Sequence, residues 1–186
     1  MKRAFEYVVI AAVAVLVALA VQAWLVKPYR IPSGSMLDTL RPGDRVLVNR
    51  VVYHLREPHR GDVVVFHYPK DPGVIFIKRI VGVPGDVLEA RDGGLFVNGR
   101  RVREPYVHRT SGDVDPTVAQ AAVAGSTLHD PWSLAEPYRV PAGEYFVMGD
   151  NRTDSDDSRD WGTVPRDAIV GEGVATYWPP SRLRSL

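Results

Sequence analysis

Two serines on either side of a glycine are the first residues whose types and spacing suggest chemistry. Ser33 and Ser35 flank Gly34 in residues 31–36, which read IPSGSM. Glycine leaves room for a reacting carbonyl to approach the backbone, because it carries no side chain. The Ser33 hydroxyl and the Ser35 N–H could then donate to a developing oxyanion. The alternative interpretation is an ordinary turn, the commoner structure for such a segment.

A serine nucleophile needs a base, and the sequence offers histidine or lysine for this role. The five histidines stand in no recognisable catalytic motif and Gly-x-Ser-x-Gly is absent, so a Ser-His-Asp triad stays open but ranks low. Lys78 lies in an apolar run, residues 74–81. Burial there would lower the pKa of its ammonium group and supply a neutral base. The alternative is a lysine that faces solvent from a half-exposed strand.

A third segment, residues 149–162, is rich in aspartate and turn-forming residues and permits three interpretations. A solvated acidic loop is the commonest structure for such a run. A calcium loop is disfavoured because, counted from Asp154, the sixth position is Arg159 instead of glycine and the twelfth is Pro165 instead of glutamate. The third interpretation is a set of polar side chains that supports a nearby active site.

Composition limits the classes of protein to which the chain can belong. Its 186 residues give room for one domain and a short appendage, with 45% hydrophobic and 24% charged residues. The formal net charge of +1 gives no reason to expect a nucleic-acid partner. Because the sequence has no cysteine, disulfides, thiol nucleophiles and cysteine-based zinc sites are excluded.

The elements that must position these residues begin with an apolar stretch, residues 7–26, whose one polar side chain is Gln22. As a helix it would be about 30 Å long, the thickness of a bilayer's hydrocarbon core. We therefore expect a transmembrane anchor at 7–26. Lys2 and Arg3 favour a cytoplasmic N-terminus at 1–6 only weakly, because Lys27 and Arg30 follow the stretch. The alternative, a cleaved secretory signal, usually has a shorter apolar stretch, and residues 24–28 make a poor cleavage site.

Residues 27–186 consist largely of short β-branched runs separated by Gly, Pro, Asp and Asn, which are typical of strands and turns. Asn98-Gly99 between two such runs predicts a hairpin with a type I′ turn. The sequence therefore predicts a mainly β protein: a single transmembrane helix followed by an all-β domain whose antiparallel sheets close into a barrel-like catalytic core. Residues 104–141 are expected to form a surface excursion.

Together these segments resemble those of the bacterial type I signal peptidases, or leader peptidases, which are serine proteases with a Ser-Lys dyad. The resemblance runs in order from the apolar stretch to about Gly171. It is carried by four groups of residues: 32–36 with Thr39 and Leu40; 60–66; 77–79 with Gly82 and 84–86; and 149–152 with Ser155, 157–159, Trp161 and Gly162.

The resemblance implies a role for each matching residue. Ser35 would be the nucleophile, Lys78 the general base, and Ser33 with the Ser35 N–H the oxyanion hole. Ser155 would form a hydrogen bond with Lys78. Asp157 and Arg159 would form an ion pair beside the site. Apolar pockets for small substrate side chains would be lined by Ile31, Pro32, Met36, Leu40, Phe76 and Ile77.

The same resemblance implies a membrane-bound serine endopeptidase that removes signal peptides from exported preproteins by cutting after Ala-x-Ala. It implies no metal and no cofactor. The partners would be preproteins and the lipid bilayer, with residues 27–186 on the extracytoplasmic side of the plasma membrane. Two rival hypotheses remain: a Ser-Lys peptidase with another task, such as a self-cleaving repressor, and a single-span β-domain that binds partners without catalysis.

Overall fold

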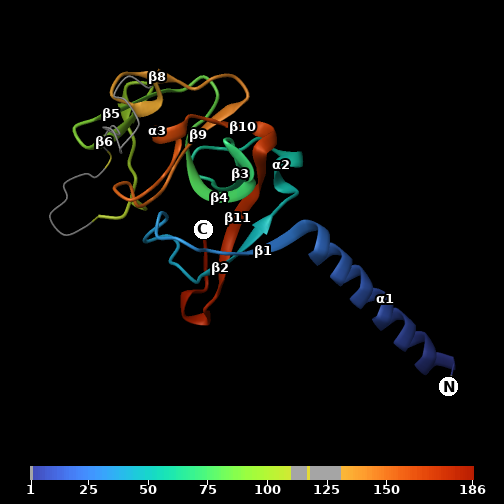
Figure 1. Ribbon diagram of the computed structural model, residues 1–186. Helices are drawn as coiled ribbons and strands as arrows, with labels where there is room; N and C mark the ends of the chain where they lie inside the picture. The colour runs from blue at the N-terminus through green and yellow to red at the C-terminus, as the bar shows by residue number, and fades with distance from the viewer. Residues whose placement is uncertain (1, 110–116, 118–130) are drawn as a thin grey trace.

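The computed structural model describes residues 2–109, 117 and 131–186, and antiparallel sheets dominate it (Figure 1). The prediction of a mainly β protein with antiparallel sheets is confirmed. Much of the predicted surface excursion, 110–116 and 118–130, lies outside the described residues.

The larger sheet contains both the strand that follows the N-terminal helix and the strand that carries Lys78. Its order is β1-β2-β11-β3-β4-β9-β10, and β12 pairs with β11. The bounds are β1 (Val26–Arg30), β2 (Arg45–Asn49), β3 (Val63–Tyr68), β4 (Asp71–Gly82), β9 (Glu144–Met148), β10 (Val164–Pro165), β11 (Ile169–Trp178) and β12 (Arg184–Ser185).

This sheet is open, so the expected closure into a barrel is wrong. Among the strands of the described residues, no pairing joins β1 at one edge to β10 at the other. Register shifts in β4 and β11 bend the sheet. The edge strand β10 has only 2 residues, too few to offer a continuous hydrogen-bond ladder to a distant strand.

The smaller sheet has the order β7-β6-β5-β8 and forms a separate layer (Figure 1). Its strands are β5 (Val87–Arg91), β6 (Gly94–Val97), β7 (Arg100–Arg101) and β8 (Tyr138–Arg139). The predicted hairpin joins β6 to β7, and both turn residues have positive φ, 52° at Asn98 and 75° at Gly99. A core cluster that includes Leu88, Leu95 and Phe146 packs this layer onto β9.

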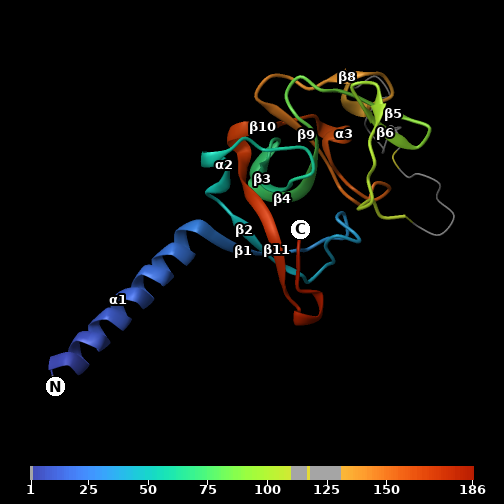
Figure 2. The ribbon, with the colours of Figure 1, turned by 180° about the vertical axis from the view of Figure 1, so that it is seen from behind.

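Helix α1 (Lys2–Leu25) covers nearly all of the apolar stretch at 7–26 and projects away from the sheets in both ribbon views (Figures 1 and 2). Several of its apolar side chains are exposed, among them Tyr7, Ile10 and Leu16. Within the described residues, no helix has the length and apolar character needed to cross a membrane. The predicted transmembrane span is therefore not found, although the helix itself is.

The remaining helices are single turns that connect strands. They are the α-helices α2 (Val52–Leu55) and α3 (Ser158–Trp161), and the 3-10 helices η1 (Pro131–Ser133), η2 (Arg166–Ala168) and η3 (Pro180–Arg182). A cluster that includes Phe66, Val147 and Trp161 packs α3 against β3 and β9. This packing brings residues 149–162 close to the Lys78 end of β4.

Candidate active site

Ser35 lies in a turn, residues 33–40, that a small apolar core fixes from both sides. Ile31, Met36 and Leu40 are 2%, 1% and 0% exposed and pack with valines of β2 and β3. The Leu40 N–H also donates to the Met36 carbonyl at 2.7 Å. Because its neighbours are buried, Ser35 is held at a defined point at the surface of the sheet.

Three of the residues expected to line substrate pockets lie beneath this turn. Ile31, Met36 and Leu40 belong to the core cluster under it, and their contact with substrate stays a prediction. Apolar residues on either side of a nucleophile suit both purposes, so residue type alone does not separate a pocket wall from an anchor.

Lys78 reaches Ser35 from the neighbouring strand β4, where it pairs with Val64 of β3. Its Nζ donates a hydrogen bond of 2.6 Å to Ser35 Oγ, and the residue is only 5% exposed. Burial lowers the pKa of Lys78, since it disfavours the charged ammonium. The carboxylates of Asp157 and Asp156 oppose this by raising the pKa, but the net direction is down.

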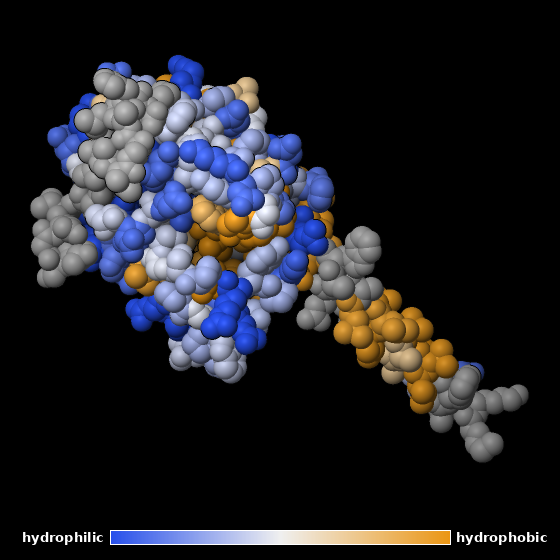
Figure 3. Space-filling model, in the orientation of Figure 1, coloured by the Kyte–Doolittle hydropathy of each residue, from blue (hydrophilic) through white to orange (hydrophobic). Residues whose placement is uncertain are grey.

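The hydroxyls of Ser33 and Ser35 lie 3.4 Å apart, and both residues line a cleft that also contains Lys78. The cleft has a volume of about 410 Å³ and is lined by residues 32–35, residues 74–78, Asp154 and Asp156. Of the six residues expected to line substrate pockets, Pro32, Phe76 and Ile77 do line it. Figure 3 shows hydrophobic side chains gathered over β3 and β4 and framed by hydrophilic ones.

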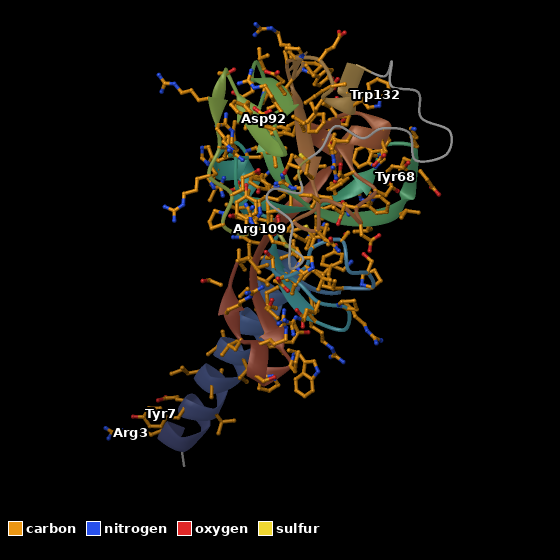
Figure 4. The ribbon with its side chains drawn as sticks, turned by 90° about the vertical axis from the view of Figure 1, so that its left-hand side faces the viewer. Arg3, Tyr7, Tyr68, Asp92, Arg109 and Trp132 are labelled. Carbon is orange, nitrogen blue, oxygen red and sulfur yellow. The ribbon has the colours of Figure 1, made fainter. Side chains whose placement is uncertain are left out.

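The apolar wall of the cleft is stiffened by aromatic rings. Tyr68, labelled in Figure 4, stacks on Phe76 with ring centroids 4.8 Å apart, and Trp161 meets Tyr68 edge-on at 5.4 Å. Val74 and Ile75 continue this wall and are 40% and 37% exposed. Sequence reasoning missed these two residues, although an exposed apolar run beside a candidate base was a usable signal.

Residues 149–162 hold the Ser35 turn in place through Asn151. The Asn151 N–H donates to the Ser35 carbonyl at 3.0 Å, and its side-chain amide donates to the Gly34 carbonyl at 3.1 Å. Two adjacent carbonyls of the turn are thereby tied to a segment more than 100 residues later in the chain. The solvated-loop interpretation of this segment is therefore wrong.

Ser155 is buried beside the Ser35 turn but does not make the predicted contact. Its Oγ has no hydrogen-bond partner among the described residues, so the expected bond to Lys78 is not formed. Ser155 packs against Gly149 so closely that a Cβ there would lie 2.2 Å from its Oγ and 2.4 Å from the Ser35 carbonyl oxygen. The site therefore requires glycine at position 149.

Asp157 and Arg159 form the expected ion pair, which is fully buried. Arg159 donates from Nε and from one terminal nitrogen to the two carboxylate oxygens, both at 2.9 Å. Burial raises the pKa of Asp157, but the charge and hydrogen bonds of Arg159, the N–H of Gly149 and the charge of Lys78 outweigh it and hold that pKa low. Asp157 also caps α3, in a capping box with Asp160.

Two further buried ion pairs escaped the sequence analysis. Arg79, next to Lys78, makes hydrogen bonds of 2.8 and 2.7 Å to both oxygens of Asp150. Arg152 does the same with Glu104, at 3.1 and 2.5 Å. Each pair joins a site segment to a distant part of the chain, and no local pattern indicates such a partner.

The sequence comparisons all point to one family of proteins. A family model described as "Signal peptidase, peptidase S26" matches residues 4–178. The chain is 38% identical to signal peptidase I of Pseudomonas fluorescens over 91% of this chain and 72% of that protein. It is 36% identical to signal peptidase IB of Staphylococcus aureus over 98% of this chain and 94% of that protein. A solved signal peptidase I from Enterococcus faecalis is 31% identical, with a TM-score of 0.47, over 63% of this chain and 97% of that one.

Proposed function

This chain belongs to the peptidase S26 family of signal peptidases, and we propose that it cuts exported preproteins with Ser35 and Lys78 as its catalytic dyad. Membership of this family makes it a serine peptidase that removes signal peptides from preproteins. One observation carries the proposed dyad: a lysine that is 5% exposed lies 2.6 Å from a serine hydroxyl in an open cleft.

The proposed reaction is acyl transfer. Neutral Lys78 accepts the proton of the Ser35 hydroxyl while Ser35 Oγ attacks the scissile carbonyl, and the carbonyl oxygen becomes an oxyanion. The Ser33 hydroxyl and the Ser35 N–H donate to this oxyanion. Lys78 then passes the proton to the leaving amine as the peptide C–N bond breaks. In the second half it takes a proton from the water that attacks the acyl-enzyme, and returns it to Ser35 Oγ as the ester bond breaks. No step needs a metal or a cofactor.

The supporting residues act on Lys78 and on the Ser35 turn. The charges of Asp157 and Arg159 nearly cancel, so the pair packs beside Lys78 without returning the pKa of Lys78 to its usual value. Asn151 keeps the Ser35 carbonyl and the Gly34 carbonyl in place while the tetrahedral intermediate forms. In the proposed catalytic state, Ser155 turns its free hydroxyl toward Lys78.

The form of the cleft suits an extended peptide with small side chains. In the described part of the sheet, β4 pairs with β9 only from Arg79 onward, so the same edge of residues 74–78 is open to a further strand. A peptide on that edge would pass Ser35 with alternate side chains facing the apolar wall. This supports cleavage after Ala-x-Ala, because small residues at the first and third positions fit between the wall and Ser35.

We also propose that α1 attaches the enzyme to a lipid bilayer, with residues 27–186 extracytoplasmic. The exposed apolar side chains of α1 support this attachment, since such a surface is unfavourable in water. Enzyme and preprotein would then share one surface, which raises the effective concentration of the scissile bond.

Cleavage of a detergent-solubilised preprotein with an Ala-x-Ala site tests the proposal. We expect wild type to cut after the second alanine, and Ser35→Ala and Lys78→Ala to fold but not to cut. The matched control is Lys70→Ala, which removes an exposed lysine outside the cleft and should leave cleavage intact. If Lys78→Ala cuts while a histidine variant does not, the base is a histidine. If folded wild type cuts no preprotein, the peptidase proposal is wrong.

A further inference from the structure

The cleft has two walls of opposite character. One is the apolar run of residues 74–77 on β4, and the other is formed by Asp154 and Asp156. Ser35 and Lys78 line the same cleft. A peptide bound there would contact apolar side chains on one side and carboxylates on the other.

The backbone fixes both carboxylates beside the cleft. The Asp154 N–H donates to the Asn151 carbonyl at 3.1 Å, in the same turn that holds Ser35. Asp156 stands between Ser155 and Asp157, which are 7% and 0% exposed, while its own side chain is exposed. The buried neighbours therefore leave Asp156 directed outward, toward the space a substrate would fill.

Neither carboxylate has an ion-pair partner in the described part of the chain, unlike the carboxylates of Asp150 and Asp157. Asp150 is neutralised by Arg79 and Asp157 by Arg159. The charge of Asp156 still reaches the base, where it raises the pKa of Lys78. An unbalanced negative charge in a cleft with an apolar wall is focused toward whatever enters.

We propose that Asp154 and Asp156 are specificity-determining residues, which favour substrates with lysine or arginine beside the scissile bond and disfavour those with aspartate or glutamate. The proposal rests on the function proposed above. The relevant positions are those whose side chains face away from the apolar wall: the second residue before the cut and the first after it. Each exposed carboxylate should change kcat/KM by about twofold to fivefold per substrate charge.

The test uses peptides with one Ala-x-Ala site that differ only in carrying Lys, Gln or Glu at one of these positions. For wild type we expect a Lys-to-Glu ratio in kcat/KM of about tenfold at the most sensitive position. Asp154→Asn and Asp156→Asn should each reduce the ratio, and the double variant should bring it close to one. The preference should fall as salt is added, because exposed charges are screened.

The matched control is Asp167→Asn, which removes an exposed carboxylate that lies outside this cleft and should keep the wild-type ratio. A wild type that cuts every peptide equally overturns the inference but leaves the proposed function standing. The inference is also overturned if the charge preference persists in the double variant. It is overturned as well if Asp156→Asn changes only the pH dependence of kcat/KM and not the Lys-to-Glu ratio. If wild type cuts none of the peptides, or the preproteins above, the proposed function fails instead.

Discussion

Removing Asp150 should destabilise the protein strongly, and removing its partner as well should reverse much of the loss. The Arg79 and Asp150 side chains are 8% and 0% exposed and share two hydrogen bonds. Breaking a buried pair from one side usually costs about 3–5 kcal/mol, because the remaining charge stays buried. In the Asp150→Ala variant, Arg79 would keep its contacts with the Gly61 carbonyl, at 2.7 Å, and with the Tyr106 ring, at 4.0 Å. The loss in free energy of unfolding should therefore lie near the low end of this range, about 3 kcal/mol.

The effect is measurable by thermal unfolding followed by circular dichroism. A loss of about 3 kcal/mol in a chain of this size lowers Tm by roughly 6–12 °C. The double variant Arg79→Met/Asp150→Leu removes both charges and should recover most of that loss. Its cleavage rate should nevertheless stay about tenfold or more below wild type, since these residues adjoin Lys78 and Asn151 and small displacements there are costly.

A matched surface pair provides the control. Glu89 lies 3.6 Å from Arg91, with side chains 27% and 50% exposed, so Glu89→Ala should cost less than about 1 kcal/mol. The reasoning is refuted if Asp150→Ala unfolds within about 1 °C of wild type. It is equally refuted if the double variant is less stable than Asp150→Ala.

Three further predictions follow from the site and its core. Lys78→Met should abolish cleavage yet raise Tm, because a buried lysine with a lowered pKa destabilises the fold most at pH below its folded-state pKa. This gain in Tm should vanish as the pH rises toward 10.5, the usual pKa of lysine, and thermal unfolding across a pH series would show it. Leu40→Ala should cost about 2–5 kcal/mol in urea unfolding, because this fully buried side chain belongs to the core; a raised KM at unchanged stability would contradict that placement. Gly149→Ala should cut kcat sharply, since the new Cβ would collide with Ser155 and the Ser35 carbonyl, whereas Gly173→Ala, whose Cβ meets nothing closer than 3.3 Å, should retain activity.

Local sequence patterns were sufficient to predict the strands and the hairpin at Asn98-Gly99, because β-branched runs and turn residues determine these elements within a few adjacent residues. They also singled out Ser35 and Lys78, whose surroundings are set by adjacent residues: glycine beside one, apolar side chains beside the other. The closure of the sheet was mispredicted, since it depends on register shifts and on the length of edge strands, which the alternation of residues does not reveal.

The contacts that hold the site together were beyond reach of the sequence for another reason. Arg79 and Asp150 are 71 residues apart, and Arg152 and Glu104 are 48 apart, so neither pair shares a local pattern. Ile31, Met36 and Leu40 have the residue types of pocket walls, and only the position of the turn on the sheet shows that they face inward. Composition shows residues 149–162 as one acidic run, although Asp150 and Asp157 are neutralised by buried arginines while Asp154 and Asp156 are not.

The position of β11 sets the order in which this enzyme can be assembled. β11 (Ile169–Trp178) lies between β2 and β3, so the first two sheet strands after β1 have no direct hydrogen bonds to each other. During synthesis the Ser35 turn and β4 emerge early, but β11, which joins β2 to β3, emerges more than 80 residues after Lys78. A nascent or truncated chain that ends before Ile169 therefore carries both reactive side chains without the frame that aligns them. We therefore expect cleavage activity only in a chain that includes β11.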